Sequence, residues 1–150
     1  MADSIARADG RALEIARHPV YSALLPIPII CFIGALITDL AYAAAPDMLW
    51  LDFSTWLLLA GLIGGGFAGL VLVLDLLRGG RERRRGLGAH FGFLLAAWIV
   101  EIFNSFVHAR DGWTAVVPTG LALSIVAVVL ALVGGWLWQS FARHQAGGPR

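Results

Sequence analysis

The sequence of 150 residues has few charged side chains, a single cysteine and no lysine. Charged residues make up 14% of the chain, whereas a water-soluble domain normally carries about 25%. Hydrophobic residues make up 59%, so the long stretches between the charges have no polar face to present to water. This composition excludes an ordinary soluble domain and is typical of an integral membrane protein.

The absence of lysine and the lone cysteine carry smaller inferences. All eleven basic residues are arginine, and alanine, glycine, leucine and valine are abundant. This usage favours a GC-rich bacterial genome and, with the apolar segments, the bacterial inner (cytoplasmic) membrane. Cys31 has no partner for an internal disulfide, and because it lies in an apolar run we expect it to be buried in lipid or protein.

The beginning of the chain lacks the apolar core of a cleavable signal peptide. Its first eighteen residues instead carry charges at Asp3, Arg7, Asp9, Arg11, Glu14 and Arg17. We therefore expect the first apolar run to remain as an uncleaved span. Residues 1–20 are predicted to form a cytoplasmic segment that includes a short interfacial helix.

Four apolar segments are long enough to cross a bilayer, which takes about 20 residues at about 1.5 Å each. The alternation of a barrel strand is missing, and unpaired backbone groups are not tolerated in lipid, so each segment is predicted to be a helix. The predicted fold is all-α: a four-transmembrane-helix bundle over residues 21–141, with a cytoplasmic tail at 142–150. The predicted helices cover residues 21–45, 53–77, 89–107 and 113–141.

The distribution of arginine predicts the orientation, because basic residues concentrate in short cytoplasmic loops. One predicted side of the membrane collects every arginine except Arg110. Both termini are therefore predicted to be cytoplasmic. Half of these arginines lie in the predicted loop at residues 78–88, where we expect them to contact anionic lipid headgroups rather than nucleic acid; the central ones are Arg81, Arg83, Arg84 and Arg85.

Two predicted helices carry small residues at four-residue spacing, which lets helices approach closely in lipid. Such rows serve either packing within one bundle or the seam of a homodimer, and spacing does not distinguish the two. The rows are Gly61, Gly65 and Gly69 in the second helix and Ala127, Ala131 and Gly135 in the fourth.

Two prolines, Pro26 and Pro28, lie in the first turns of the first predicted helix. Proline has no N–H and leaves the carbonyl four residues earlier without its usual donor. A kink is therefore predicted near the inner surface.

Ionisable residues inside apolar spans are costly unless paired or hydrated, so each is a candidate functional residue. An outer layer contains Asp39, late in the first helix, and Glu101, Asn104 and His108, which share one face of the third. One interpretation is a hydrogen-bond network that fixes helix packing. The other is a hydrated cluster that opens outward.

An inner layer contains three histidines and one acidic residue at the opposite depth. Histidines from two or three helices at one level could ligate a haem b iron or another transition metal. The alternative is that they lie close to water, where histidine costs little. These residues are His18, His90, His144 and the inner acidic residue Asp75.

These motifs resemble a bacterial family of small four-helix membrane proteins, domain of unknown function 2231. The resemblance runs from His18 to about His144 and includes the opening HPVYSALLPIP, the glycine-rich second helix, the arginine loop and the closing GGWLWQSFARHQ. After His90 the family tends to have an asparagine, whereas this chain reads HFGFLL. The resemblance implies no assigned activity. Relatives that are joined to redox domains favour a role in electron transfer for the inner histidines.

The sequence has no recognisable nucleophile–base pair, nucleotide-binding loop or complete metal-binding motif. The leading hypothesis is therefore a non-enzymatic membrane protein that acts as a structural or partner-binding subunit, with the lipid bilayer and a second copy or another membrane subunit as its partners. An alternative is a haem-binding redox subunit that uses the inner histidines. A third is a small transporter or proton-conducting bundle that uses the outer polar residues.

Overall fold

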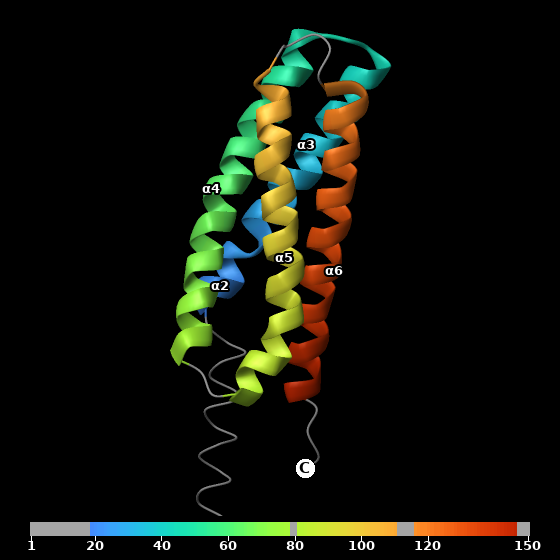
Figure 1. The fold of residues 1–150 in the computed structure, drawn as a ribbon. Coiled ribbons are helices and arrows are strands. Elements are labelled where there is room, and N and C mark those ends of the chain that lie inside the picture. Colours follow the sequence, from blue (N-terminus) through green and yellow to red (C-terminus); the bar gives the residue numbers. More distant parts are fainter. Residues whose placement is uncertain (1–18, 79–80, 111–115, 147–150) are drawn as a thin grey trace, which may run out of the picture.

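The computed structural model describes residues 19–78, 81–110 and 116–146, and these ranges contain helices and short connections but no strand. Four long helices follow a short one, α2 (Pro19–Leu24). They are α3 (Pro26–Ala44), α4 (Met48–Arg78), α5 (Arg81–His108) and α6 (Leu121–Ala146) (Figure 1). The all-α prediction is confirmed, while the predicted helix before residue 18 lies outside the described residues.

The four predicted membrane crossings are all present. Apolar helical segments of sufficient length run over Val20–Ala44, Met48–Arg78, Gly88–His108 and Val116–Ser140. Large apolar side chains cover the outer surface; Ile30, Trp56 and Leu77, for example, are 66%, 69% and 67% exposed. Such a continuous apolar surface is a liability in water and the natural covering in lipid. The chain is a multi-pass membrane protein.

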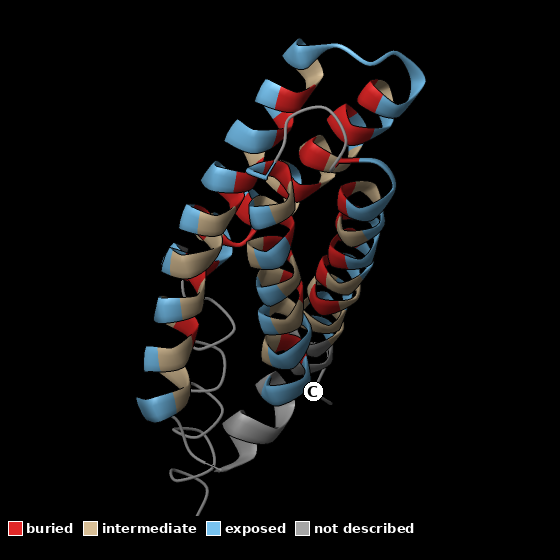
Figure 2. Ribbon diagram, turned by 45° about the horizontal axis from the view of Figure 1, so that its top comes forward, coloured by how far each residue is buried: buried red, intermediate tan, exposed pale blue. Residues whose placement is uncertain are grey.

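The bundle is a ring of antiparallel neighbours. Each long helix packs against the next one in the sequence, and α3 packs against α6 to close the ring. The α3–α4 connection lies at one end, and the α4–α5 connection lies at the other, together with α2 and the last turns of α6 (Figure 1). We call these the α3–α4 end and the arginine end. Buried residues face the interior of the ring and exposed residues face outward (Figure 2).

The first span is interrupted at Leu25, between α2 and α3. Pro26 opens α3 and has no N–H to donate to Ser22, while Pro28 has none to donate to Leu24. The preceding backbone bond, from the amide of Leu25 to the carbonyl of Tyr21, persists at 2.9 Å. The irregularity expected at the two prolines is therefore present as a break between α2 and α3, although Leu25 itself keeps helical angles (φ −55°, ψ −39°).

Two helices begin earlier in the sequence than predicted. Helix α4 begins at Met48 rather than residue 53, and α5 begins at Arg81 rather than residue 89. Most of the predicted arginine loop is thus the first turns of α5, in keeping with the good helix propensity of arginine. Among the described residues of α5, the apolar segment long enough to span a membrane runs over Gly88–His108.

The fourth span begins with an irregular turn, η1 (Val116–Gly120). Within it Val117 is extended, with φ −116° and ψ 126°. The residue before a proline is disfavoured in the helical region, and Pro118 follows. Regular α-helix therefore starts only at Leu121.

The glycine row of α4 faces other helices of the same bundle. A Cβ atom added to Gly61 would lie 2.5 Å from the Phe32 ring of α3, and one added to Gly65 would lie 2.8 Å from Trp98 of α5. A Cβ added to Gly69 would have no neighbour within 4 Å. Two of the three glycines therefore allow close helix contact, and the third borders open space.

The small-residue row of α6 also points inward. Ala127 and Ala131 are 0% and 2% exposed, and a Cβ added to Gly135 would lie 3.5 Å from Ile29 of α3. The short side chains let α6 approach α3 closely. Both alanines are thus used inside the bundle rather than on its outer surface.

Candidate functional site

Six polar side chains from all four long helices meet in one buried layer near the α3–α4 end. His108 is 5% exposed and the other five residues are 0% exposed. The side chains of Asp39 and His108 are both fully buried. We call this set the polar layer. Its members are Asp39 of α3, Ser54 of α4, Glu101, Asn104 and His108 of α5, and Ser124 of α6.

Helix periodicity brings these residues to one depth. Asp39 lies five residues before the end of α3 and Ser54 six residues after the start of α4, so at about 1.5 Å per residue they are level. The three α5 residues follow one another at spacings of three and four, which places them on one face. The four residues that the sequence singled out are therefore brought together, and two serines join them.

Asp39 is the centre of the layer. Its Oδ1 accepts a hydrogen bond of 2.5 Å from the Ser54 hydroxyl and lies 2.9 Å from Nε2 of His108. Its Oδ2 accepts a hydrogen bond of 2.5 Å from the Ser124 hydroxyl. One carboxyl group thus connects α3 to each of the other three long helices, and contacts of this number stabilise a buried carboxylate.

The hydrogen bonds of His108 define where its protons lie. Its Nδ1 is 3.0 Å from the backbone carbonyl of Asn104, which can only accept, so Nδ1 carries a hydrogen. Its Nε2 lies 2.9 Å from Oδ1 of Asp39 and 3.1 Å from the Ser54 hydroxyl. Because that hydroxyl donates its hydrogen to Asp39, a second proton lies between Nε2 and Oδ1. Whether this proton resides on the imidazole or on the carboxyl group, the pair of side chains has no net charge.

Asn104 connects Glu101 to the rest of the layer. Its Nδ2 donates one hydrogen bond to Oε2 of Glu101 and another to the hydroxyl of Ser124, both at 2.8 Å. Two buried acceptors remain, Oε1 of Glu101 and Oδ1 of Asn104, which have no hydrogen-bond partner within the described part of the chain. Such atoms are uncommon because an unpaired buried polar group is costly.

The closed geometry favours one of the two sequence interpretations of this cluster. The layer has almost no exposed surface, and most of its donors and acceptors are used between helices. This arrangement fits a hydrogen-bond network between helices better than a hydrated cluster that opens outward.

A second buried polar contact lies at the arginine end. His90 of α5 is 1% exposed and is therefore buried between the helices. Its Nδ1 lies 2.7 Å from the carbonyl of Gly134 in α6, and its Nε2 is hydrogen-bonded to the hydroxyl of Tyr21 in α2. Trp138 packs against both rings, with centroids 5.0 Å from Tyr21 and 5.2 Å from His90.

The described residues do not fit a haem or metal site. Both ring nitrogens of His90 are engaged within the protein, which leaves none for iron. His18 lies outside the described residues, and the side chain of His144 is likewise not described. Across residues 19–78, 81–110 and 116–146, no group of three or more histidine, cysteine or acidic side chains is arranged to hold a metal ion.

The remaining predicted inner residues lie at the arginine end. Asp75 is half-buried near the end of α4. The four arginines predicted to contact headgroups lie in the first turns of α5, and their side chains are not among those described; they are Arg81, Arg83, Arg84 and Arg85. Their contact with lipid remains a prediction.

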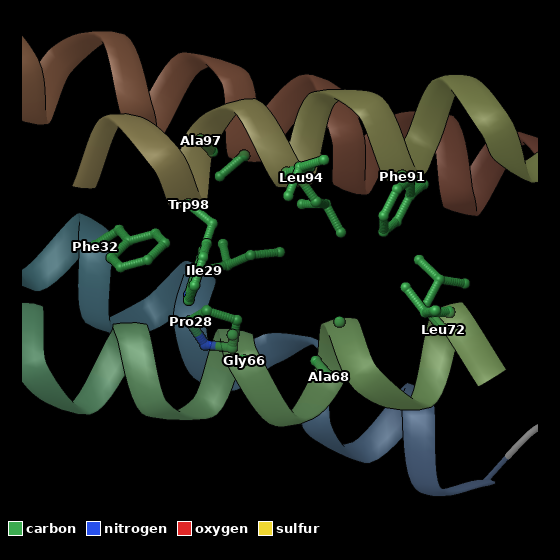
Figure 3. Close-up of a pocket in the computed structure, with 15 residues that line it drawn as sticks. Pro28, Ile29, Phe32, Gly66, Ala68, Leu72, Phe91, Leu94, Ala97 and Trp98 are labelled. Carbon is green, nitrogen blue, oxygen red and sulfur yellow. The ribbon is translucent and has the colours of Figure 1, made fainter. Parts of the chain in front are cut away.

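An apolar cavity of about 220 Å³ lies about midway along the bundle, where α4 and α5 face each other (Figure 3). Residues from all four long helices line it, and Phe91 and Leu94 of α5 face Leu72 of α4 across the space (Figure 3). Gly69 borders it, where a side chain would have no neighbour within 4 Å. The indole N–H of Trp98 is already donated to the carbonyl of Leu62 at 2.9 Å, so this polar group is not available to an occupant.

Sequence reasoning did not single out Ser54, Ser124 or Tyr21. Burying a serine in an apolar span costs little free energy and is common. A serine therefore does not mark a candidate site as an aspartate does. The one available signal is depth: Ser54 lies as far from the α3–α4 connection as Asp39 does. An aromatic residue near the end of an apolar span is usually interfacial, so Tyr21 gave no signal that its hydroxyl binds His90.

Comparison with known proteins agrees with this architecture. Residues 17–147, most of the chain, match a family model described as predicted membrane protein (DUF2231). No curated protein and no solved structure matches the chain.

Proposed function

The chain belongs to the DUF2231 family of predicted membrane proteins, and on this premise we propose that it is a non-enzymatic, partner-binding subunit of the bacterial inner membrane. The arginine distribution supports a cytoplasmic position for both of its termini. One observation carries the proposal: the polar layer is closed upon itself, whereas an apolar cavity beside α4 and α5 leaves room for another group.

The polar layer is suited to hold the bundle rather than to bind a substrate. Asp39 bonds to side chains of three other helices, and Asn104 adds a contact from α5 to α6. In membrane proteins each such bond contributes on the order of 1 kcal/mol. Several of them in one layer fix the relative rotation of all four helices at the α3–α4 end.

The cavity provides the surface on which a partner helix would pack. In lipid, helices associate through close packing rather than through the hydrophobic effect, so a space bordered by small residues favours insertion of an apolar side chain. Gly69 leaves such a space on α4. The partner is a membrane-embedded helix, from a second copy of the chain or from another subunit, that places an apolar side chain beside Gly69.

Two leucine substitutions test this proposal. Gly69→Leu places a side chain in the cavity, whereas Gly92→Leu places one at an exposed position of α5 that also has nothing within 4 Å of a Cβ atom. Both replace a helical glycine with leucine, so the pair is matched. Native mass spectrometry in mild detergent should show a complex for the wild type and Gly92→Leu that is lost in Gly69→Leu. A wild type that is monomeric, or equal complexes in both variants, would contradict the proposal.

A further inference from the structure

The polar layer contains more acidic than basic groups. The titratable side chains that face it are Asp39 from α3 and Glu101 and His108 from α5, whereas α4 and α6 contribute serine hydroxyls. Asp39 and His108 have no net charge as a pair, wherever their shared proton lies. An ionised Glu101 would therefore leave one uncompensated negative charge in a layer with almost no exposed surface, which is costly at this depth.

The polar layer also has more hydrogen-bond acceptors than donors. Oε1 of Glu101 and Oδ1 of Asn104 are acceptors without a donor within the described part of the chain. An ionised carboxylate offers acceptors only, whereas a protonated carboxyl group also offers an O–H donor. One proton on Glu101 thus removes the net charge and supplies a donor where the layer has too few.

A bound metal cation would compensate the excess negative charge and the unpaired acceptors less well than a proton. Hard cations require about six oxygen ligands, and the described residues hold no group of three or more histidine, cysteine or acidic side chains arranged for an ion. A proton needs a single oxygen atom, and Oε1 of Glu101 is unpartnered.

We propose that Glu101 is a proton-binding site whose carboxyl group is protonated in the folded bundle at neutral pH. The polar layer then holds two titratable protons, one on Glu101 and one shared by Asp39 and His108. Hydrogen bonds through Asn104 and Ser124 connect the two. Because this connection passes through α3, α5 and α6, loss of the Glu101 proton loosens helix packing. This inference does not depend on partner binding.

Infrared spectroscopy of the full chain in lipid vesicles tests the proposal. A protonated carboxyl group gives a carbonyl band apart from the amide bands, and this band shifts in deuterium oxide. We expect the band in the wild type at neutral pH, its loss in Glu101→Gln and its retention in Asp47→Asn, which alters an exposed carboxylate. Absence of the band from the wild type, or an unchanged band in Glu101→Gln, overturns the proposal.

Two further measurements keep the test decisive. Selective ¹³C labelling of glutamate shifts a glutamate band but no aspartate band, so if Glu101→Gln fails to fold it still shows that the protonated group is a glutamate, of which Glu101 is the only buried one among the described side chains. Thermal unfolding in sodium chloride is compared with that in choline chloride at equal ionic strength. Equal midpoints support the proton, whereas a sodium-dependent rise that is lost in Glu101→Gln overturns it in favour of a bound cation.

Discussion

Nε2 of His108 lies 2.9 Å from Oδ1 of Asp39, although the two residues are 69 positions apart in the sequence. The contact joins the last turn of α5 to the late part of α3, and both side chains are fully buried. A charged or proton-sharing pair of this kind has no replacement by water inside the membrane, so its geometry must be maintained by the helices around it. The stability of the bundle should therefore depend strongly on Asp39.

Replacement of Asp39 by alanine should destabilise the bundle by about 3 to 5 kcal/mol, the usual cost of breaking a buried pair. The substitution removes the acceptor used by Ser54, His108 and Ser124 together. Ser54→Ala, which removes one donor, should cost on the order of 1 kcal/mol. Reversible unfolding in mixed micelles measures both, and equal losses would show that Asp39 is not the centre of the network.

Gly61→Ala should destabilise the bundle, whereas Gly69→Ala should not. At Gly61 the new methyl group would lie 2.5 Å from the Phe32 ring and 3.1 Å from Cβ of Cys31, so overpacking should cost about 1 to 3 kcal/mol. At Gly69 it would meet nothing within 4 Å, and the change should stay within about 0.5 kcal/mol. The two variants have the same change in helix propensity, so equal stabilities would contradict the packing of α4 on α3.

Tyr21→Phe should weaken the arginine end without affecting the polar layer. The variant removes the hydroxyl that bonds to Nε2 of His90 and keeps the ring that packs on Trp138. The expected loss is on the order of 1 kcal/mol, as for other bonds between membrane helices. Combined with Asp39→Ala, its effect should be additive because the two groups share no partner. A large coupling energy would mean that the two ends are not independent.

The visible spectrum of the purified protein should not depend on His90. Because both ring nitrogens of His90 are already bonded, protein from haem-supplied cells should show no Soret band that disappears in His90→Ala. The measurement compares the visible spectra recorded before and after reduction with dithionite. A reduced α band that is lost in His90→Ala would instead show that the ring releases Tyr21 or Gly134 to bind iron.

Single cysteines should report the predicted orientation. On a Cys31→Ser background, Asp47→Cys places a thiol in the exposed α3–α4 connection and Arg143→Cys places one at an exposed position near the end of α6. A membrane-impermeant maleimide added to intact spheroplasts should label Asp47→Cys but label Arg143→Cys only after lysis. The opposite pattern would reverse the topology.

The sequence by itself determined the membrane class, the number of spans and the break in the first helix. These features follow from local physics: about 20 apolar residues cross a bilayer, and a proline lacks a backbone donor. Asp39, Glu101, Asn104 and His108 could also be selected from the sequence, because ionisable residues at membrane depth are costly.

Only the tertiary structure decided which helix faces meet. Rotation of a helix about its axis is set by packing with its neighbours, and in lipid all sides of these helices are similarly apolar. For this reason the hydrogen bonds from Ser54 and Ser124 to Asp39, and the contact of Tyr21 with the buried His90, could not be derived from the sequence. The same packing separates Gly61, which has no room for a side chain, from Gly69, which borders the cavity.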